Sequence, residues 1–312
     1  MDKPMDVLRD FPIRKTKKQK AAFREAVLTY ASSLGYACKE ERGSMGAVNI
    51  LIGDVDAAKV LVTAHYDTCA VMPVPNFITP CNFLIYLLYQ LLITVVIIGG
   101  AGLVGGLIGG LLSSEFLAIF LAEVFFFGLF ALLIAGPANK NNANDNTSGV
   151  VSVLETAATL SEEQRKSMAF VLFDLEEAGL IGSSAYRKAH RKASAGQLIL
   201  NVDCAGDGRE LMMVPTKKLK KQSAQLERLQ QLCPPEGERL LYVKQKGFAF
   251  YPSDQSNFPY GLGIAAFHRK PVLGLYLSRI HTKRDTILDE NNVALLRDYF
   301  LRVVDEAAKE RN

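Results

Sequence analysis

The sequence predicts an α/β fold: a three-layer sandwich in which helices flank a mostly parallel, mixed sheet, interrupted by a two-helix transmembrane hairpin. Alternating strand-like and helical segments predict the sandwich. The distribution of charge predicts the interruption. Residues 83–136 contain only Glu115 and Glu123 as charged groups, whereas all 36 Lys and Arg residues lie outside this block. The hydrophobic content of 49% therefore averages two different kinds of segment.

The segments before the apolar block begin the sandwich. Residues 17–33 place apolar side chains such as Phe23 and Val27 on one side of a helix. Short apolar runs then predict strands at residues 36–38, 48–52 and 60–64.

The segments after the block alternate in the same way. Periodicity predicts helices at residues 148–160, 180–192 and 217–232 and from residue 291 onward. Apolar runs predict strands at residues 168–173, 198–202, 264–267 and 273–276. We expect one discontinuous domain, residues 1–82 plus 137–312, with residues 83–136 as an insertion.

The apolar block reads as two membrane spans. Residues 83–112 form a run of 30 without a charge, and residues 116–136 form a second apolar run of 21, which contains Glu123. About 20 apolar residues cross a bilayer core, and the alternative is a helix pair buried in a soluble core. Small residues recur at every fourth position, which lets helices approach closely in lipid, either within the hairpin or between subunits. They are Gly102, Gly106 and Gly110 on one face and Gly105 and Gly109 on another.

Glu123 and the basic residues beside the apolar block indicate how the hairpin would lie in a membrane. Glu123 lies inside the second span, where an acid is costly, so it is either functional or protonated and bonded to a backbone carbonyl or to Thr94. Lys140 and the basic residues of 14–20 flank the hairpin on the side of its ends. Positive charge favours the cytoplasm. We expect an integral membrane protein with two transmembrane helices and a cytoplasmic domain.

Composition excludes several other classes. A net charge of +4, without a basic-aromatic array, does not indicate a nucleic-acid partner. The five cysteines are scattered and form no CxxC pair, which favours free thiols in a reducing compartment. The first 20 residues have no apolar signal-peptide core.

Metal-ligating residue types gather at the ends of the predicted strands. In α/β sheets ligands bind where strands end, so these side chains are expected to meet. Imidazole and carboxylate without Cys suit Zn²⁺, with Co²⁺ or Mn²⁺ possible, and carboxylates can bridge a metal pair. Of two adjacent glutamates, one can bind metal while the other takes a proton from water. The residues are His65, Asp67, Asp145, Glu176, Glu177, Asp203 and His281.

Five motifs resemble those of the M28 family of co-catalytic zinc aminopeptidases, in that family's order. They are HYDT (65–68), NDNTSG (144–149), EEAGLIGS (176–183), NVD (201–203) and HTKRDT (281–286). The resemblance implies a zinc exopeptidase-like fold. One departure is large, because 77 residues, including the apolar hairpin, separate Asp67 from Asp145 where soluble members have a short loop. We therefore expect the active-site mouth to face, or lie near, the membrane surface.

The resemblance also implies a role for each residue. His65 and Asp203 would bind one zinc, Glu177 and His281 the other, and Asp145 would bridge the two. Glu176 would be the general base that activates a metal-bridged hydroxide. Asp67 would orient His65, and Asp285 would support the His281 loop.

The resulting expectation is a membrane-anchored metallo-aminopeptidase with two Zn²⁺ ions, acting on peptides with a free N-terminus. Its other partners would be the lipid bilayer and a second copy bound through the Gly102/Gly106/Gly110 face. A single-zinc glutaminyl cyclase-like acyltransferase is one alternative. The other is a non-catalytic membrane scaffold or transport-linked binding protein that uses Glu123.

Several further residues receive plainer interpretations. His190 and His268 have basic neighbours, so we expect them in solvent. Cys69 and Cys204 are expected to be small packing residues. Asp254 either shapes the substrate pocket or belongs to a turn. The lysines of 217–221 form a solvated helix face or rest on anionic lipid.

Overall fold

A single mixed sheet organises the chain outside the apolar block. The computed structural model describes residues 1–235 and 237–309. Within them nine strands pair in the order β1-β2-β4-β3-β5-β8-β6-β7, with β9 on β8. The strands are β1 (Cys38–Arg42), β2 (Val48–Ile52), β3 (Val60–His65), β4 (Met168–Phe173), β5 (Leu198–Val202), β6 (Glu210–Pro215), β7 (Leu240–Val243), β8 (Gly261–Lys270) and β9 (Gly274–Tyr276).

The centre of the sheet is parallel and both sides carry antiparallel additions. Neighbours β4, β3, β5 and β8 are parallel, so the ends of β4, β3 and β5 lie side by side at one edge. On one side β2 joins β4 antiparallel and β1 joins β2 antiparallel. On the other side β6 joins β8 antiparallel and β7 joins β6 parallel. The prediction of a mixed α/β sheet is confirmed.

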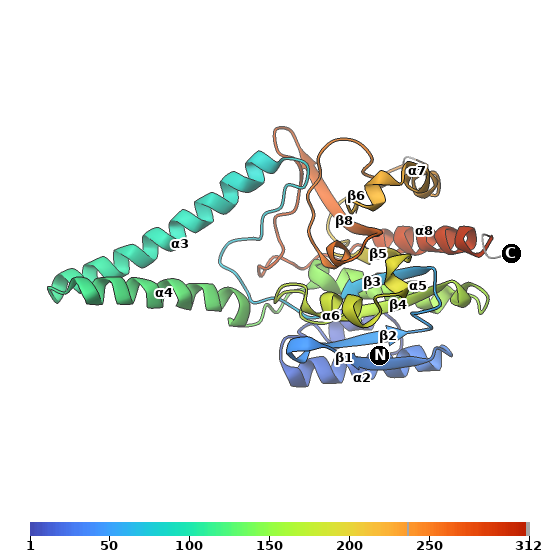
Figure 1. Ribbon diagram of the computed structural model, residues 1–312, viewed down its shortest axis with the longest axis horizontal. Coiled ribbons are helices and arrows are strands. Elements are labelled where there is room, and N and C mark those ends of the chain that lie inside the picture. Colours follow the sequence, from blue (N-terminus) through green and yellow to red (C-terminus); the bar gives the residue numbers. More distant parts are fainter. Residues whose placement is uncertain (236, 310–312) are drawn as a thin grey trace.

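Helices cover both faces of this sheet (Figure 1). Buried side chains of α2, α5, α7 and α8 share one core with Val62 and Leu200, whereas α6 contributes Tyr186 to a second core with Leu61 and Ile199. Successive strand residues point to opposite faces, so both faces of each central strand are apolar. The helices are α1 (Asp6–Asp10), α2 (Lys17–Ser33), α3 (Phe83–Leu111), α4 (Glu115–Ala135), α5 (Gly149–Thr159), α6 (Ile181–Ala189), α7 (Ser223–Gln231) and α8 (Glu290–Lys309).

Four segments differ most from the sequence prediction. The strand expected at residues 36–38 begins at Cys38 and runs through charged residues to Arg42, because it is an edge strand whose side chains reach solvent. The short strands β6 and β7 were not predicted. The helix expected at residues 217–232 is instead a 3₁₀ turn, Leu219–Lys221, followed by α7. Four lysines within five residues repel one another at helical spacing, which disfavours one continuous helix.

The apolar block forms a helical hairpin that projects away from the sheet (Figure 1). Helices α3 and α4 agree with the predicted spans to within one residue at each end. Both are long and apolar enough to cross a membrane, with mean hydropathies of 2.5 and 2.6. Only 11% of the most apolar window of α3, and none of that of α4, is buried.

Two glycines of α3 let it pack closely against α4 near the tip of the hairpin. A Cβ atom on Gly109 would lie 2.3 Å from Ala118 Cβ, and one on Gly105 would lie 2.4 Å from the Ala118 carbonyl oxygen. Gly106, by contrast, has open space beside it, as do Gly102 and Gly110. The Gly105/Gly109 face therefore packs within the hairpin, and the Gly102/Gly106/Gly110 face points outward. The Thr94 hydroxyl donates to Gln90 O (2.8 Å) rather than to Glu123.

The two ends of the insertion meet at the sheet domain. Ala70 and Ala138 form an antiparallel bridge, Val71 N donates to Pro137 O (2.8 Å), and Asn139 N donates to Cys69 O (3.1 Å). The hairpin therefore leaves and re-enters the domain at one place, at the edge where β3 ends.

Candidate metal centre

The parallel strands bring most of the predicted ligands to one edge. His65 is the last residue of β3, Asp203 follows β5, and Glu176 and Glu177 follow β4. Because β4, β3 and β5 are adjacent and parallel, these residues converge. His65 and Asp203 are buried, at 1% and 7% exposure.

Asp145 lies between the two histidines. It sits in a turn, Ala143–Ser148, that precedes α5, and its own backbone (φ −109°, ψ 97°) is not helical. Its Oδ1 is 3.3 Å from His65 Nε2 and its Oδ2 is 3.1 Å from His281 Nε2. Asp203 Oδ1 is 3.5 Å from His65 Nε2, and Glu177 Oε2 is 3.4 Å from His281 Nε2. The structure thus forms two ligand groups that share one carboxylate.

Asp67 connects three of these residues. Its carboxylate accepts hydrogen bonds from Glu176 N (3.1 Å) and Glu177 N (3.2 Å). His65 Nδ1 lies 3.2 Å from the Asp67 backbone oxygen and 3.5 Å from Asp67 Oδ1. A carboxylate behind a ligating imidazole fixes the orientation of the ring. Asp67 therefore positions both the histidine and the two glutamates.

Asp285 has a different position from the one expected. Instead of bracing the His281 loop alone, its carboxylate accepts hydrogen bonds from Asn144 N (2.7 Å) and Asp145 N (3.0 Å). It thereby fixes the backbone that carries the Asp145 side chain. Burial, and then the charge of Asp145, raises the pKa of Asp285 to about 7.

Sequence reasoning missed Arg14, which it treated as part of a basic flank. Arg14 is fully buried. Its guanidinium donates to Phe11 O (2.6 Å), Tyr66 O (2.5 Å) and Thr147 Oγ1 (3.2 Å). Burial lowers its pKa to about 10, opposed by the charges of Asp67 and Asp145. The one signal in the sequence was that Arg14 stands where an apolar stretch meets a basic one, which is weak evidence for a buried arginine.

The electrostatics of the cluster are dominated by burial and by opposite charges in contact. Burial alone would lower the pKa of both histidines, but the neighbouring carboxylates raise that of His65 well above its usual value and that of His281 to about 9. Burial raises the pKa of Glu177 to about 8 and that of Glu176 well above its usual value. Burial opposes ionisation of Asp145, yet hydrogen bonds with both histidines lower its pKa.

These residues fit a pair of divalent cations. Two imidazoles face a larger number of carboxylates, so the cluster has excess negative charge that cations would balance. Glu177 Oε1 is buried without a hydrogen-bond partner. The potential ligand atoms of His65, Asp145 and Asp203 all lie within 4.8 Å of one another. Nitrogen and oxygen donors at such spacing suit Zn²⁺.

Cys69 lies closer to the cluster than expected. Its sulfur is within 4.8 Å of ligand atoms of Glu177 and His281. Burial raises the pKa of the thiol, so it stays protonated and a weak ligand.

A cavity of about 330 Å³ opens over the cluster. Its apolar wall includes Ile78, Leu180, Tyr251 and Ile280. Ile78 belongs to the connector 71–82, which leads from β3 to α3 and runs beside the His281 loop, where Met72 N donates to His281 O (2.7 Å). The root of the hairpin is therefore one wall of the cavity.

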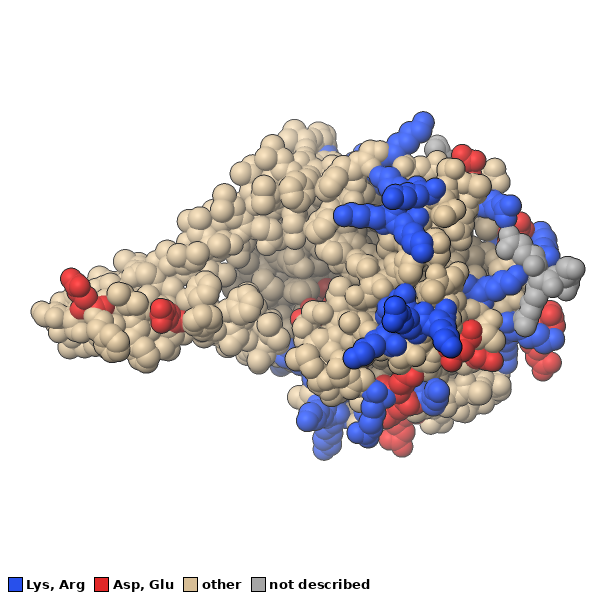
Figure 2. All heavy atoms as spheres, in the orientation of Figure 1, with Lys and Arg blue, Asp and Glu red and all other residues tan. Residues whose placement is uncertain are grey.

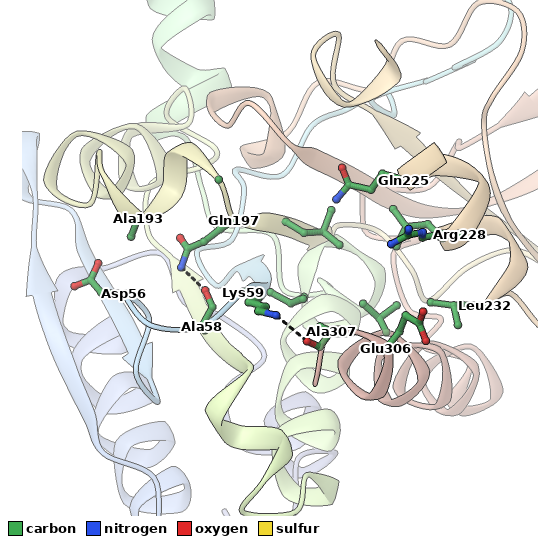
Figure 3. A pocket seen from close by; sticks show the side chains of 15 residues that line it. Asp56, Ala58, Lys59, Ala193, Gln197, Gln225, Arg228, Leu232, Glu306 and Ala307 are labelled. Atoms are coloured by element: carbon green, nitrogen blue, oxygen red, sulfur yellow. Dashed lines mark hydrogen bonds between the residues drawn. The ribbon is translucent and has the colours of Figure 1, made fainter. Parts of the chain in front are cut away.

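A second cavity, of about 400 Å³, lies at the opposite edge, where β3 and β5 begin (Figure 3). There Gln197 donates to Ala58 O (2.7 Å) and Lys59 donates to Ala307 O (3.1 Å). None of the predicted ligands is among its lining residues, so we place the functional site at the metal cluster.

Two other predictions need correction. His190 is not solvated: it stacks on Tyr186 at 4.3 Å and lies between Asp56 Oδ1 (2.7 Å) and Glu41 Oε2 (2.8 Å). His268 is half-buried, with Nε2 2.9 Å from Asp207 Oδ1.

Asp254 begins a 3₁₀ turn, Asp254–Asn257, as one of its two interpretations expected, and it is fully buried there. That burial raises the pKa of its carboxyl group to about 7.

Solved structures with this fold include both peptidases and cyclases. A glutaminyl cyclase of Porphyromonas gingivalis superposes with a TM-score of 0.61 at 17% identity, covering 97% of this chain and 96% of that one. A Zn-dependent exopeptidase of Parabacteroides distasonis gives 0.60 at 14%, covering 94% and 92%. The LapA aminopeptidase of Legionella pneumophila gives 0.59 at 13%, covering 98% and 71%. At these identities the likeness establishes the fold alone.

Sequence comparison supplies the family. No curated protein matches the chain. The model of peptidase family M28, however, matches residues 131–303, more than half of the chain. That range contains four of the five motifs, and HYDT lies before it on β3. The chain belongs to peptidase family M28.

Proposed function

We propose that this chain is a membrane-anchored di-zinc exopeptidase that removes N-terminal residues from peptides. The observation that carries the proposal is the position of Asp145, whose two oxygens face His65 on one side and His281 on the other. A carboxylate in that position can bridge two metal ions. His65, Asp203 and Asp145 would hold one ion, and Glu177, His281 and Asp145 the other.

The protein side chains would handle the protons. Bound zinc ions supply Lewis acidity that polarises a carbonyl and makes water a nucleophile at neutral pH. Glu176 lines the same cavity, and burial raises its pKa above the usual value, which makes the carboxylate a stronger base. It would accept a proton from the attacking water and pass it to the departing amine. Asp67 holds the Glu176 backbone in place for that transfer.

The cavity favours a substrate with a free amino group. Carboxylates of Asp145, Glu176, Glu177 and Asp203 line it, and their charge attracts an ammonium group. The apolar wall of Ile78 and Ile280 suits the first side chain.

The hairpin supports anchoring in a bilayer. At 1.5 Å per residue α4 is about 32 Å long, close to the ~30 Å hydrocarbon core, and α3 is about 44 Å long. A longer helix must tilt to fit, and α3 is inclined to α4 in Figure 1. Lys15 Nζ donates to Ile134 O (2.7 Å) at the base of α4, and a cation there favours a cytoplasmic domain. The outward Gly102/Gly106/Gly110 face is free to pack on a second copy.

The direct test is Glu176→Gln, with Glu162→Gln on the exposed surface as the matched control. Hydrolysis of aminoacyl reporter substrates should fall by at least a hundredfold in Glu176→Gln and stay unchanged in the control. Full hydrolysis by Glu176→Gln would show that the mechanism is wrong.

Glutaminyl cyclisation is the second candidate, because similar folds include glutaminyl cyclases. Metal analysis and a cyclisation assay separate the two. We expect two zinc ions per chain and release of free amino acids from a peptide library. One zinc per chain, with conversion of N-terminal glutamine to a cyclic product, would favour the cyclase.

A further inference from the structure

An aromatic cluster surrounds the first turn of α3. Phe248 and Phe250, on the loop after β7, are 53% and 41% exposed. Phe83 packs edge-on against both, with ring centroids 5.5 Å and 6.3 Å away. Tyr86 lies 5.9 Å from Phe250. Two aromatic side chains of the soluble domain thus continue the apolar surface of the candidate span.

Lysines surround this aromatic pair. Segments 215–222 and 244–252 contain six lysines and no acidic residue. The two segments are joined where Lys220 Nζ donates to Gly247 O (2.9 Å). We name this surface the basic–aromatic collar: Lys217, Lys218, Lys220, Lys221, Lys244, Lys246, Phe248 and Phe250. Figure 2 shows basic side chains on the domain beside the hairpin, which carries no Lys or Arg and only the acidic residues Glu115 and Glu123.

The collar also encloses a cavity of about 440 Å³. Lys217 and Lys218 line it together with Phe250 and Pro252. Cationic groups beside apolar walls suit an anionic headgroup attached to hydrocarbon.

We propose that the basic–aromatic collar docks onto the anionic phospholipid surface of the leaflet that the hairpin enters. This inference rests on the proposed anchoring. Aromatic side chains favour the interface between headgroups and acyl chains, and lysines close to an anionic leaflet bind its negative surface. The collar has both, and its contacts with Phe83 and Tyr86 place it where α3 starts.

Docking would fix the orientation of the active-site mouth. The loop that carries Phe248 and Phe250 continues into Tyr251 and Pro252, which line the metal-site cavity. Tyr251 Oη donates to Asp203 O (3.1 Å). The same loop therefore touches the collar surface on one side and the metal cluster on the other.

The chain has no tryptophan, so single-tryptophan variants report on each part separately. Phe248→Trp reports on the collar. Phe127→Trp, 64% exposed on α4, reports on hairpin insertion. Full-length protein is placed in phosphatidylcholine bilayers with or without phosphatidylglycerol, and fluorescence is measured with brominated acyl chains as quenchers.

We expect Phe127→Trp to be quenched in both bilayers and Phe248→Trp mainly in the anionic one. In the Phe248→Trp background, Lys217→Gln with Lys218→Gln should lower the docking equilibrium about 30-fold. Lys166→Gln with Lys309→Gln is the matched control, far from the hairpin, and should have no effect. High salt should release the collar, because it screens exposed charges.

The possible failures are distinct. Quenched Phe127→Trp with unquenched Phe248→Trp, or equal quenching of Phe248→Trp with and without phosphatidylglycerol, overturns the collar proposal and leaves the anchor intact. Unquenched Phe127→Trp overturns both. An emission shift of Phe248→Trp with an acidic peptide in detergent, and none with anionic lipid, assigns the surface to a peptide and overturns the lipid proposal.

Discussion

Asp67→Asn is the sharpest test of how the site is held together. The carboxylate of Asp67 accepts from the backbone N–H groups of Glu176 and Glu177 at 3.1 and 3.2 Å and lies beside His65 Nδ1. Asparagine keeps the shape but replaces one oxygen with an NH₂ group. One backbone N–H then faces a donor, and the negative charge behind the imidazole is lost.

The magnitude follows from these contacts. A hydrogen bond to a charged group contributes about 1.5–3 kcal/mol, and an unsatisfied buried donor costs about 1–3 kcal/mol. Attributing about 2–3 kcal/mol to misplacement of Glu176 and Glu177 predicts a fall in kcat/KM of roughly 30- to 150-fold. Loss of the carboxylate charge 3.5 Å from His65 Nδ1 should also weaken zinc binding by up to about 10- to 100-fold, although the Asp67 backbone oxygen at 3.2 Å stays in place.

The assay combines steady-state hydrolysis of an aminoacyl reporter with zinc titration against a competing chelator. Asp54→Asn is the matched control, since Asp54 also accepts a backbone N–H, that of Ala57 (3.1 Å), in an exposed turn. The control should keep both activity and zinc affinity. If Asp67→Asn kept both within twofold, Asp67 would not position the site.

Three further predictions use other parts of the molecule. Chelation should abolish hydrolysis and lower Tm, and zinc at 100 times its Kd should restore about 2.7 kcal/mol of stability per site. Gly109→Ala should destabilise the hairpin by about 1–3 kcal/mol in detergent unfolding, because its Cβ would meet Ala118, while Gly106→Ala, facing open space, should not. Burial would lower the pKa of His190, but two carboxylates raise it. Its stabilising effect is therefore full below the unfolded pKa of about 6.5 and lost as pH rises through the folded value. His190→Gln should cost up to about 1 kcal/mol near pH 5 and less near pH 9 in thermal unfolding.

The sequence could predict which candidate ligands lie close together, because their positions follow from the order and direction of the strands. His65 ends one buried strand, Glu176 and Asp203 follow two others, and parallel neighbours end at one edge. The spacing could not predict the turn at Ala143–Ser148, in which Asp145 has a non-helical backbone and faces both histidines. No periodic pattern encodes such a turn, since it depends on Asp285, 140 residues away, accepting the Asp145 N–H.

Two basic residues are buried although the sequence predicts that they lie in solvent. Arg14 and Lys20 lie in a segment whose composition is typical of a solvated flank, yet both are buried. Lys20 Nζ pairs with Asp174 Oδ1 (2.7 Å), and Arg14 spans to Thr147. Their partners come from distant segments, so only the folded chain reveals that these cations support the site.

The position of the hairpin explains how a long insertion leaves the metal cluster assembled. Ala70 pairs with Ala138, so the two ends of the insertion are held together at the sheet domain. The length of the insertion beyond this bridge therefore does not change the distance that the domain must close. Loop-closure cost rises only slowly with length, by about 0.6 kcal/mol per doubling. The first part of the insertion is also used structurally: the connector hydrogen-bonds the His281 loop at Met72, and Tyr89 Oη of α3 donates to Pro75 O (2.7 Å). The apolar helices and the histidine loop are therefore joined through one short segment, and that segment forms the wall on which a substrate would lie.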